Sequence, residues 1–168
     1  DDLFGVRYRF KFIAQISAGI LLCIGGLNIH SLYGVLGIYE IPAWAGIPLT
    51  VLMTVFIINA FNLIDGIDGL SGMLTQLTML VYGTIFVIYG DFLSAFFAAA
   101  ILGITTPYLY YNIFGSARKG TKIFMGGTGS TSLGLFITAL GIRVLQVTDG
   151  GSAMIPACNP AILALSPI

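Results

Sequence analysis

Charged residues are scarce in this chain of 168 residues, because Asp, Glu, Lys and Arg together make up 8% of it. A soluble domain usually carries roughly 25% of these residues, so there are too few here to cover the surface of a soluble monomer. This scarcity excludes a disordered chain, a coiled coil and a nucleic-acid-binding protein. The single histidine, His30, and the two distant cysteines, Cys23 and Cys158, exclude a His-rich metal centre within this chain and a disulfide scaffold.

Apolar residues are abundant instead: they make up 57% of the chain, and the mean hydropathy is +0.98. A transmembrane helix needs about 20 mostly apolar residues. Five runs approach that length, at roughly 12–29, 47–64, 70–89, 92–114 and 131–147. With no internal repeat and no linker, the pattern predicts an all-α fold, a polytopic transmembrane bundle with one membrane domain over residues 1–168. We also expect the chain, which begins at Asp1, to be a fragment or a processed product of a larger multi-span protein.

The basic residues indicate how the bundle lies in the membrane. Six of the seven gather in two segments: Arg7, Arg9 and Lys11 before the first run, and Arg118, Lys119 and Lys122 between the fourth and fifth runs. Five spans place both segments on one side of the membrane. Because Lys and Arg are enriched on the cytoplasmic side, the N-terminus and the 115–130 segment are predicted to be cytoplasmic, with the protein in the cell's inner (plasma) membrane.

Four of the seven acidic residues fall on the same predicted side: Asp1, Asp2, Asp65 and Asp68. Asn62 and Asn59 lie one and two turns deeper on the run that ends at Asp65, so these side chains take neighbouring positions on one slowly rotating helix face. Polar groups at membrane depth cost free energy unless they face a cavity or a partner. Two interpretations are open. The asparagines could hold helices together while the aspartates are solvated loop charges, or these side chains could form a functional site.

The functional interpretation is a site for a metal and a phosphate. Mg²⁺ usually takes one or two carboxylates together with substrate phosphates. Residues 126–130 read as a Gly-rich loop that opens onto the fifth run, with Ser130 or Thr131 as the N-cap. Free N–H groups at a helix start bind phosphate, and Lys122 adds positive charge.

Two segments carry a resemblance to a known family. The sequence NAFNLIDGIDGL at residues 59–70 closely resembles the signature of the polyprenyl-phosphate N-acetylhexosamine-1-phosphate transferases, or glycosyltransferase family 4. KIFMGGTGS at residues 122–130 resembles the family's third cytoplasmic motif, and Asp1-Asp2-Leu3 resembles its aspartate pair. The resemblance covers essentially the whole chain, and the order of the motifs also agrees.

The resemblance implies transfer of a sugar-1-phosphate from a UDP-N-acetylhexosamine to a polyprenyl (undecaprenyl) phosphate, with release of UMP, for cell-envelope polysaccharides. The implied cofactor is Mg²⁺, or Mn²⁺ in its place, held by Asp1, Asp2 and Asp65. The implied partners are both substrates and the lipid bilayer, with no nucleic acid; a homo-oligomer stays open. Asp1, Asp2, Asp65 and Asp68 are the implied catalytic residues, and the implied substrate-binding residues are Asn59, Asn62, Lys122, Gly129 and Ser130.

The chain departs from the family pattern in two places. The third motif has a metal-binding Asp where this chain has Gly127, and a downstream His-rich loop is absent. Phe61 and Ile64 resemble the N-acetylglucosamine type more than the MurNAc-pentapeptide type. Two alternatives therefore remain: a catalytically inactive membrane fragment, for which Gly127 is the best support, and a transporter or channel, in which intramembrane Asn and Asp mark an ion path.

Overall fold

The computed structural model describes residues 8–32 and 40–148. They form five α-helices in the order α1 (Tyr8–Ile24), α2 (Ala43–Ile64), α3 (Leu70–Ile88), α4 (Phe92–Phe114) and α5 (Gly126–Thr148), with a short 3₁₀ helix, η2 (Ala117–Lys119), before α5. The described ranges contain no strand, only an isolated bridge between Ser31 and Glu40. The prediction of an all-α helical bundle is confirmed.

Four of the helices, α2 to α5, are long and apolar enough to cross a membrane, so the protein is a multi-span membrane protein. The first predicted span, 12–29, is shifted: α1 begins at Tyr8, has 17 residues and ends at Ile24, so it falls short of the length that a span requires. It ends early because Gly26 adopts a left-handed conformation with φ +82°. The Leu27 N–H then reaches back to the Leu22 carbonyl at 2.9 Å, which closes the last turn although the apolar run continues.

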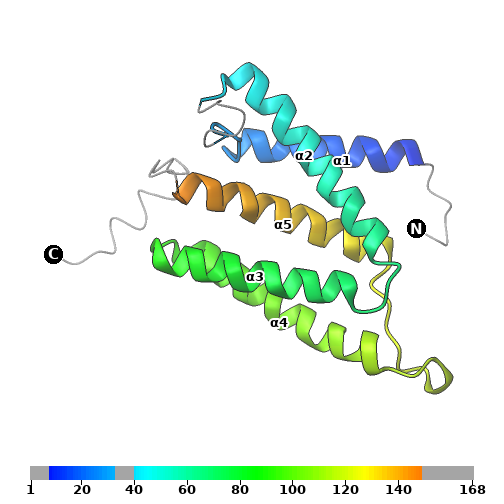
Figure 1. Ribbon diagram of the computed structural model, residues 1–168. Helices are drawn as coiled ribbons and strands as arrows, with labels where there is room; N and C mark the ends of the chain where they lie inside the picture. The colour runs from blue at the N-terminus through cyan, green and yellow to red at the C-terminus, as the bar shows by residue number, and fades with distance from the viewer. Residues whose placement is uncertain (1–7, 33–39, 149–168) are drawn as a thin grey trace.

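The helices are arranged as two antiparallel hairpins, α1–α2 and α3–α4, with α5 between them (Figure 1). Small residues let the backbones approach. A Cβ atom added at Gly134 of α5 would lie 2.8 Å from the Ile58 Cα atom of α2, and one at Gly19 of α1 would lie 3.1 Å from Val51 Cα. Such close approach is typical of helices packed in a membrane.

A compact apolar core joins the two hairpins to α5. Its members, which come from α2, α3, α4 and α5, are Phe61, Met79, Ala98, Ile101 and Ile137. Large apolar side chains remain exposed on every helix, as expected for a surface that faces lipid. Buried threonines, by contrast, hydrogen-bond to a carbonyl of their own helix, as Thr54 does to Thr50 at 2.7 Å and Thr138 does to Gly134 at 2.7 Å.

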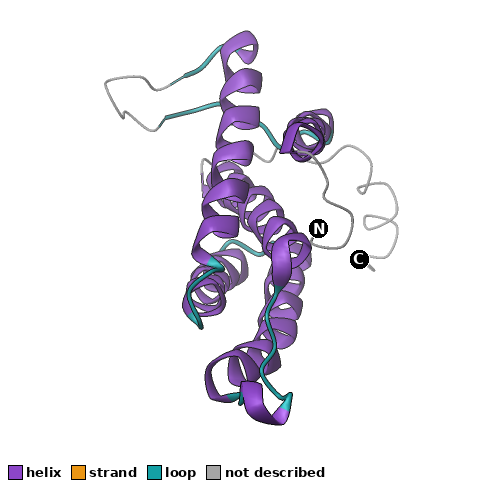
Figure 2. Cartoon of the chain, turned by 90° about the vertical axis from the view of Figure 1, so that its right-hand side faces the viewer, coloured by secondary structure: helices purple, strands orange, loops and turns teal. Residues whose placement is uncertain are grey.

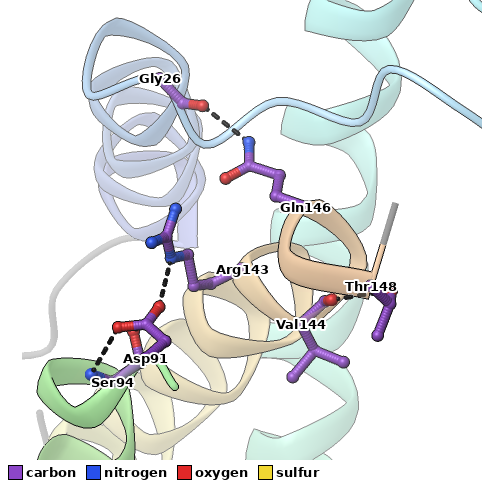
Figure 3. A network of polar contacts seen from close by, with 7 residues as sticks. All are labelled: Gly26, Asp91, Ser94, Arg143, Val144, Gln146 and Thr148. Atoms are coloured by element: carbon purple, nitrogen blue, oxygen red, sulfur yellow. Dashed lines mark hydrogen bonds and ion pairs between the residues drawn. The ribbon is translucent and has the colours of Figure 1, made fainter. Parts of the chain in front are cut away.

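Two polar ends result from this arrangement. One end, which faces the viewer in Figure 2, gathers the first residues of α1, α3 and α5 and the last residues of α2 and α4. At the opposite end Arg143 of α5 donates to Asp91, the N-cap of α4, at 2.7 Å (Figure 3). Gln146 nearby donates to the Gly26 carbonyl at 2.8 Å, which ties α5 to the end of α1.

Candidate active site

The turn between α2 and α3 positions the first candidate carboxylate, Asp65. Its Oδ1 atom accepts a hydrogen bond from the buried Ser71 hydroxyl at 2.9 Å and lies 3.5 Å from the Tyr108 hydroxyl of α4. Within the described residues Oδ2 accepts no hydrogen bond. Gly69 completes the turn with φ +76°, and a Cβ atom there would lie 2.9 Å from the Ile113 side chain, so the turn requires glycine. Asp65 is therefore held in place through Oδ1, which leaves Oδ2 without a hydrogen-bond donor among the described residues.

The second candidate carboxylate, Asp68, forms an ion pair with Lys122 from the segment that precedes α5. The Asp68 side chain is 50% exposed and that of Lys122 is 22% exposed, so the pair borders solvent. The Lys122 ammonium also lies 5.3 Å from the centre of the Phe124 ring. The predicted meeting of the two motifs is thus present: residues 54 positions apart come into contact.

The predicted Gly-rich loop at 126–130 is wrong, because these residues form the first turns of α5. Ser130 is consequently no N-cap. It is fully buried in the second turn, and its hydroxyl donates to the carbonyls of Gly126 and Gly127 at 3.1 and 3.3 Å. Asn62 of α2 donates to the same hydroxyl oxygen at 3.0 Å. Packing against α2 thus overrides the low helix propensity of glycine.

Asn59 takes a different environment from the other predicted residues. Its amide donates to Gln15 of α1 and to the Val55 carbonyl, both at 2.8 Å. Asn59, Asn62 and Asp65 therefore contact three different neighbours: α1, α5 and the α3–α4 pair. The slow rotation along α2 spreads the three side chains around the site rather than aiming them into one pocket.

A model of glycosyl transferase family 4 matches residues 1–145. This chain belongs to glycosyl transferase family 4. Among curated relatives, a probable undecaprenyl-phosphate N-acetylglucosaminyl 1-phosphate transferase of Bacillus subtilis is 33% identical over 150 residues, covering 84% of this chain and 38% of the relative. Phospho-N-acetylmuramoyl-pentapeptide-transferases of Halalkalibacterium halodurans and Caldicellulosiruptor bescii are 30% and 32% identical, each covering 96% of this chain and 51% of the relative.

The family 4 chain thus spans about half the length, or less, of the curated relatives that it matches. No solved structure matches it significantly.

A cavity of about 260 Å³ lies between α1, α2 and α5 of the family 4 chain. Its polar lining comes from α1 and from the first turns of α5: Lys11, Gln15, Gly127, Thr128, Thr131 and Ser132. Gly127 therefore borders the same cavity as Lys11.

A divalent metal fits the described carboxylates only in part. The described ranges hold no group of three His, Cys, Asp or Glu side chains close enough to bind a metal. Asp65 offers a carboxylate, and Asp68 shares its charge with Lys122. Asp1 and Asp2, the other predicted ligands, lie outside the described residues. Because Mg²⁺ usually takes only one or two protein carboxylates and completes its shell with phosphate and water, this donor set is compatible with Mg²⁺ carried by a phosphate.

Sequence reasoning missed the side chains that support the site. Ser71 and Tyr108 hold Asp65, Gln15 holds Asn59, and Asn112 of α4 bridges two segments. Their signal was present, because each is a polar or hydroxylated residue inside an apolar run. Phe61 and Ile64, the residues that resemble the N-acetylglucosamine type, belong to the core and its edge.

Proposed function

We propose that the protein transfers an N-acetylhexosamine 1-phosphate from a UDP-sugar to a polyprenyl phosphate and releases UMP. In this reaction a phosphate oxygen of the lipid bonds to the phosphorus atom that carries the sugar, and the bridging bond of the diphosphate breaks. The observation that carries the proposal is the convergence of Asp65, Asp68, Lys122 and Ser130 from two segments far apart in the sequence at one end of a family 4 bundle.

The chemistry suits such a site. Phosphoryl transfer depends mainly on positioning and on neutralising charge, so it needs little covalent help from the protein. Lys122 supplies positive charge at the mouth, and Asp65 presents a fixed carboxylate oxygen. Mg²⁺ held by Asp65, with Asp1 and Asp2, would neutralise the diphosphate. A site at a membrane mouth lets a water-soluble nucleotide sugar meet a lipid acceptor.

The site end is proposed to face the cytoplasm of a bacterial plasma membrane. Arg118, Lys119 and Lys122 lie at this end, whereas the turn between α3 and α4 at the opposite end carries Asp91 and no basic residue. UDP-sugars and Mg²⁺ are available on the cytoplasmic side. We propose that the products serve cell-envelope synthesis such as peptidoglycan or lipopolysaccharide. The similarity to an undecaprenyl-phosphate N-acetylglucosaminyl 1-phosphate transferase and to phospho-N-acetylmuramoyl-pentapeptide-transferases supports this proposal.

The alternative of a transporter or channel finds less support. Every acidic residue in the described ranges, namely Glu40, Asp65, Asp68 and Asp91, lies outside the helices rather than near the middle of the bilayer. An ion path through the bundle would place such groups along it.

The test is transfer of labelled sugar phosphate to polyprenyl phosphate by the complete protein in vesicles, with release of UMP as a second readout. UDP-N-acetylglucosamine and UDP-MurNAc-pentapeptide are offered separately, which identifies the donor. Asp65→Asn and Asp68→Asn should each lower turnover by about 100-fold or more, because an amide cannot supply the negative charge. Glu40→Gln, an exposed carboxylate at the opposite end, is the matched control and should leave turnover unchanged. Near-normal turnover of both aspartate variants would contradict the assignment.

A further inference from the structure

Asn112 occupies an unusual position between two parts of the candidate site. It lies in the last turns of α4 and is 3% exposed. Its Oδ1 atom accepts a hydrogen bond from the Gly69 N–H at 2.6 Å, and its Nδ2 atom donates to the Ile123 carbonyl at 2.8 Å. Both partners are main-chain groups, so the Asn112 side chain fixes backbone rather than another side chain.

The two backbone partners directly follow the two members of the ion pair. Gly69 follows Asp68, and Ile123 follows Lys122. Among the described residues, Asn112 and the ion pair itself provide the polar links between the α2–α3 turn and the segment that precedes α5. Asn112 therefore supplies the buried polar link between the two segments, beside the exposed ion pair itself.

We propose that Asn112 is a positioning residue that holds Asp68 and Lys122 in register for the transfer reaction, an inference that rests on the proposed function. A displacement of about 1 Å can cost about 100-fold in rate. A residue that bonds to the backbone of both segments limits how far Asp68 and Lys122 can move relative to each other. The Asn112 side chain joins the two segments through their backbone, and this role requires no contact with substrate.

The neighbouring contacts on α4 give the amide a rigid base. Ile113 packs against Gly69, and Leu109 packs against Gly72 so closely that a Cβ atom at Gly72 would lie 2.8 Å from it. The end of α4 and the start of α3 are thus in direct contact around Asn112. A shift of the amide would have to move both helices, so its position is well determined.

The first experiment measures the geometry without using activity. Nitroxide labels are placed at Ile67 and Phe124, which are 60% and 66% exposed on the two segments, in the complete protein with Cys23 and Cys158 replaced by Ser. The unsubstituted protein should give one narrow distance distribution by pulsed electron paramagnetic resonance. Asn112→Leu, of similar volume but without hydrogen bonds, should broaden it. An unchanged distribution in Asn112→Leu overturns the proposal.

Two control variants separate positioning from general loss of stability. Thr105→Val removes a buried hydroxyl from the same helix. This hydroxyl donates to the Ile101 and Leu102 carbonyls of α4 itself, so its loss should leave the distribution narrow. Met79→Ala opens a cavity in the core away from the two segments, so it should lower the melting temperature without broadening the distribution. Equal broadening in Met79→Ala and Asn112→Leu would show that Asn112 acts only through stability.

The second experiment uses the pH dependence of turnover. Asn112→Asp keeps the acceptor for Gly69 but loses the donor to Ile123 while the carboxyl is ionised. Burial raises the pKa of a carboxyl above its ordinary value of about 4, and a protonated carboxyl donates to Ile123 again. Turnover of Asn112→Asp relative to the unsubstituted protein should therefore be reduced about tenfold or more at pH 8 and recover as the pH falls toward 5.5.

A ratio of turnovers for Asn112→Asp that stays flat with pH would overturn the proposal, and so would normal turnover in Asn112→Leu. If the unsubstituted protein transfers no sugar phosphate, the proposed function fails, while the distance measurement still decides whether Asn112 joins the two segments.

Discussion

At the scale of single residues, Gly127 is the position where chain and family differ most in chemistry. It lines the cavity between α1, α2 and α5, and its carbonyl accepts hydrogen bonds from Ser130 and Thr131. The backbone at this position is therefore engaged in the first turns of α5. We expect a change at Gly127 to affect metal binding more than the fold.

Gly127→Asp should raise turnover and Mg²⁺ dependence together. Mg²⁺ is usually bound by only one or two protein carboxylates, so one additional carboxylate should strengthen its binding markedly. We expect the Gly127 form to insert normally, bind Mg²⁺ weakly and transfer slowly. The measurement is turnover against Mg²⁺ concentration for both forms of the complete protein. Identical activity and identical metal dependence would show that position 127 holds no ligand here.

Asp91 shows how a single ion pair stabilises the opposite end. Burial alone would raise its pKa, but hydrogen bonds from Arg143 and Ser94 outweigh burial, so the pKa of Asp91 lies below its ordinary value. A carboxyl with a lowered pKa in the folded state stabilises that state above its unfolded pKa. This stabilisation is lost as the pH falls through the folded value.

Asp91→Asn should therefore lower the melting temperature near pH 7 by roughly 2–4 °C for each kcal/mol lost, and the gap from the unsubstituted protein should close below about pH 4. Melting curves of Asp91→Asn and of the unsubstituted protein, both in detergent and measured from pH 3 to pH 7, test this expectation. A gap that is constant across this range would mean that the ion pair adds nothing to stability.

At the scale of helices, close backbone contact between α2 and α5 sets the shape of the bundle. Gly134 brings the two helices together beside Ile58, and Asn62 then reaches Ser130 one turn further on. Any side chain at Gly134 must push α5 away from α2. The site contact between these helices therefore depends on a glycine one turn away from it.

Gly134→Ala should destabilise the fold by about 1–3 kcal/mol, the usual cost of forcing atoms into a packed core. The matched control is Gly103→Ala on α4, where a Cβ atom meets nothing within 4 Å. That control should be neutral or slightly stabilising, since alanine favours helix. Thermal unfolding in detergent separates the two, and equal melting temperatures would contradict the role given to Gly134.

Helix existence could be predicted from the sequence, but two helix boundaries could not. Apolar runs of spanning length predicted α2, α3 and α4 within a few residues. Gly126 to Ser130 read as a loop because glycine disfavours helix locally, while the structure extends α5 over them through contacts with α2. Such contacts join residues more than 60 positions apart, so no local pattern contains them.

At the scale of the whole molecule, the placement of charges predicted which segments meet. Asp65, Asp68 and Lys122 were assigned to one membrane side, and the structure places them at one end of the bundle. The supporting residues, such as Ser71 and Asn112, could not be predicted from the sequence because their roles depend on how α3 packs against α4. Asp1 and Asp2 lie outside the described residues, so their predicted role stays a prediction.

Labelling from the two sides of the membrane tests this orientation. Single cysteines at Lys119 and at Tyr89, both exposed and at opposite ends, are introduced after Cys23 and Cys158 are replaced by Ser. In intact cells a membrane-impermeant thiol reagent should label the cysteine at Tyr89 and reach that at Lys119 only after lysis. Labelling of both from outside would refute the proposed topology.

The position of α5 between the two hairpins governs when the protein becomes competent during its synthesis. The ribosome delivers the α1–α2 and α3–α4 hairpins before α5. At that stage Asp68 has no Lys122 and Asn62 has no Ser130, because both partners are still untranslated. The segment that precedes α5 and α5 itself therefore complete the described part of the site, and a nascent chain that stops before residue 122 holds the acidic turn without the basic residue that faces it.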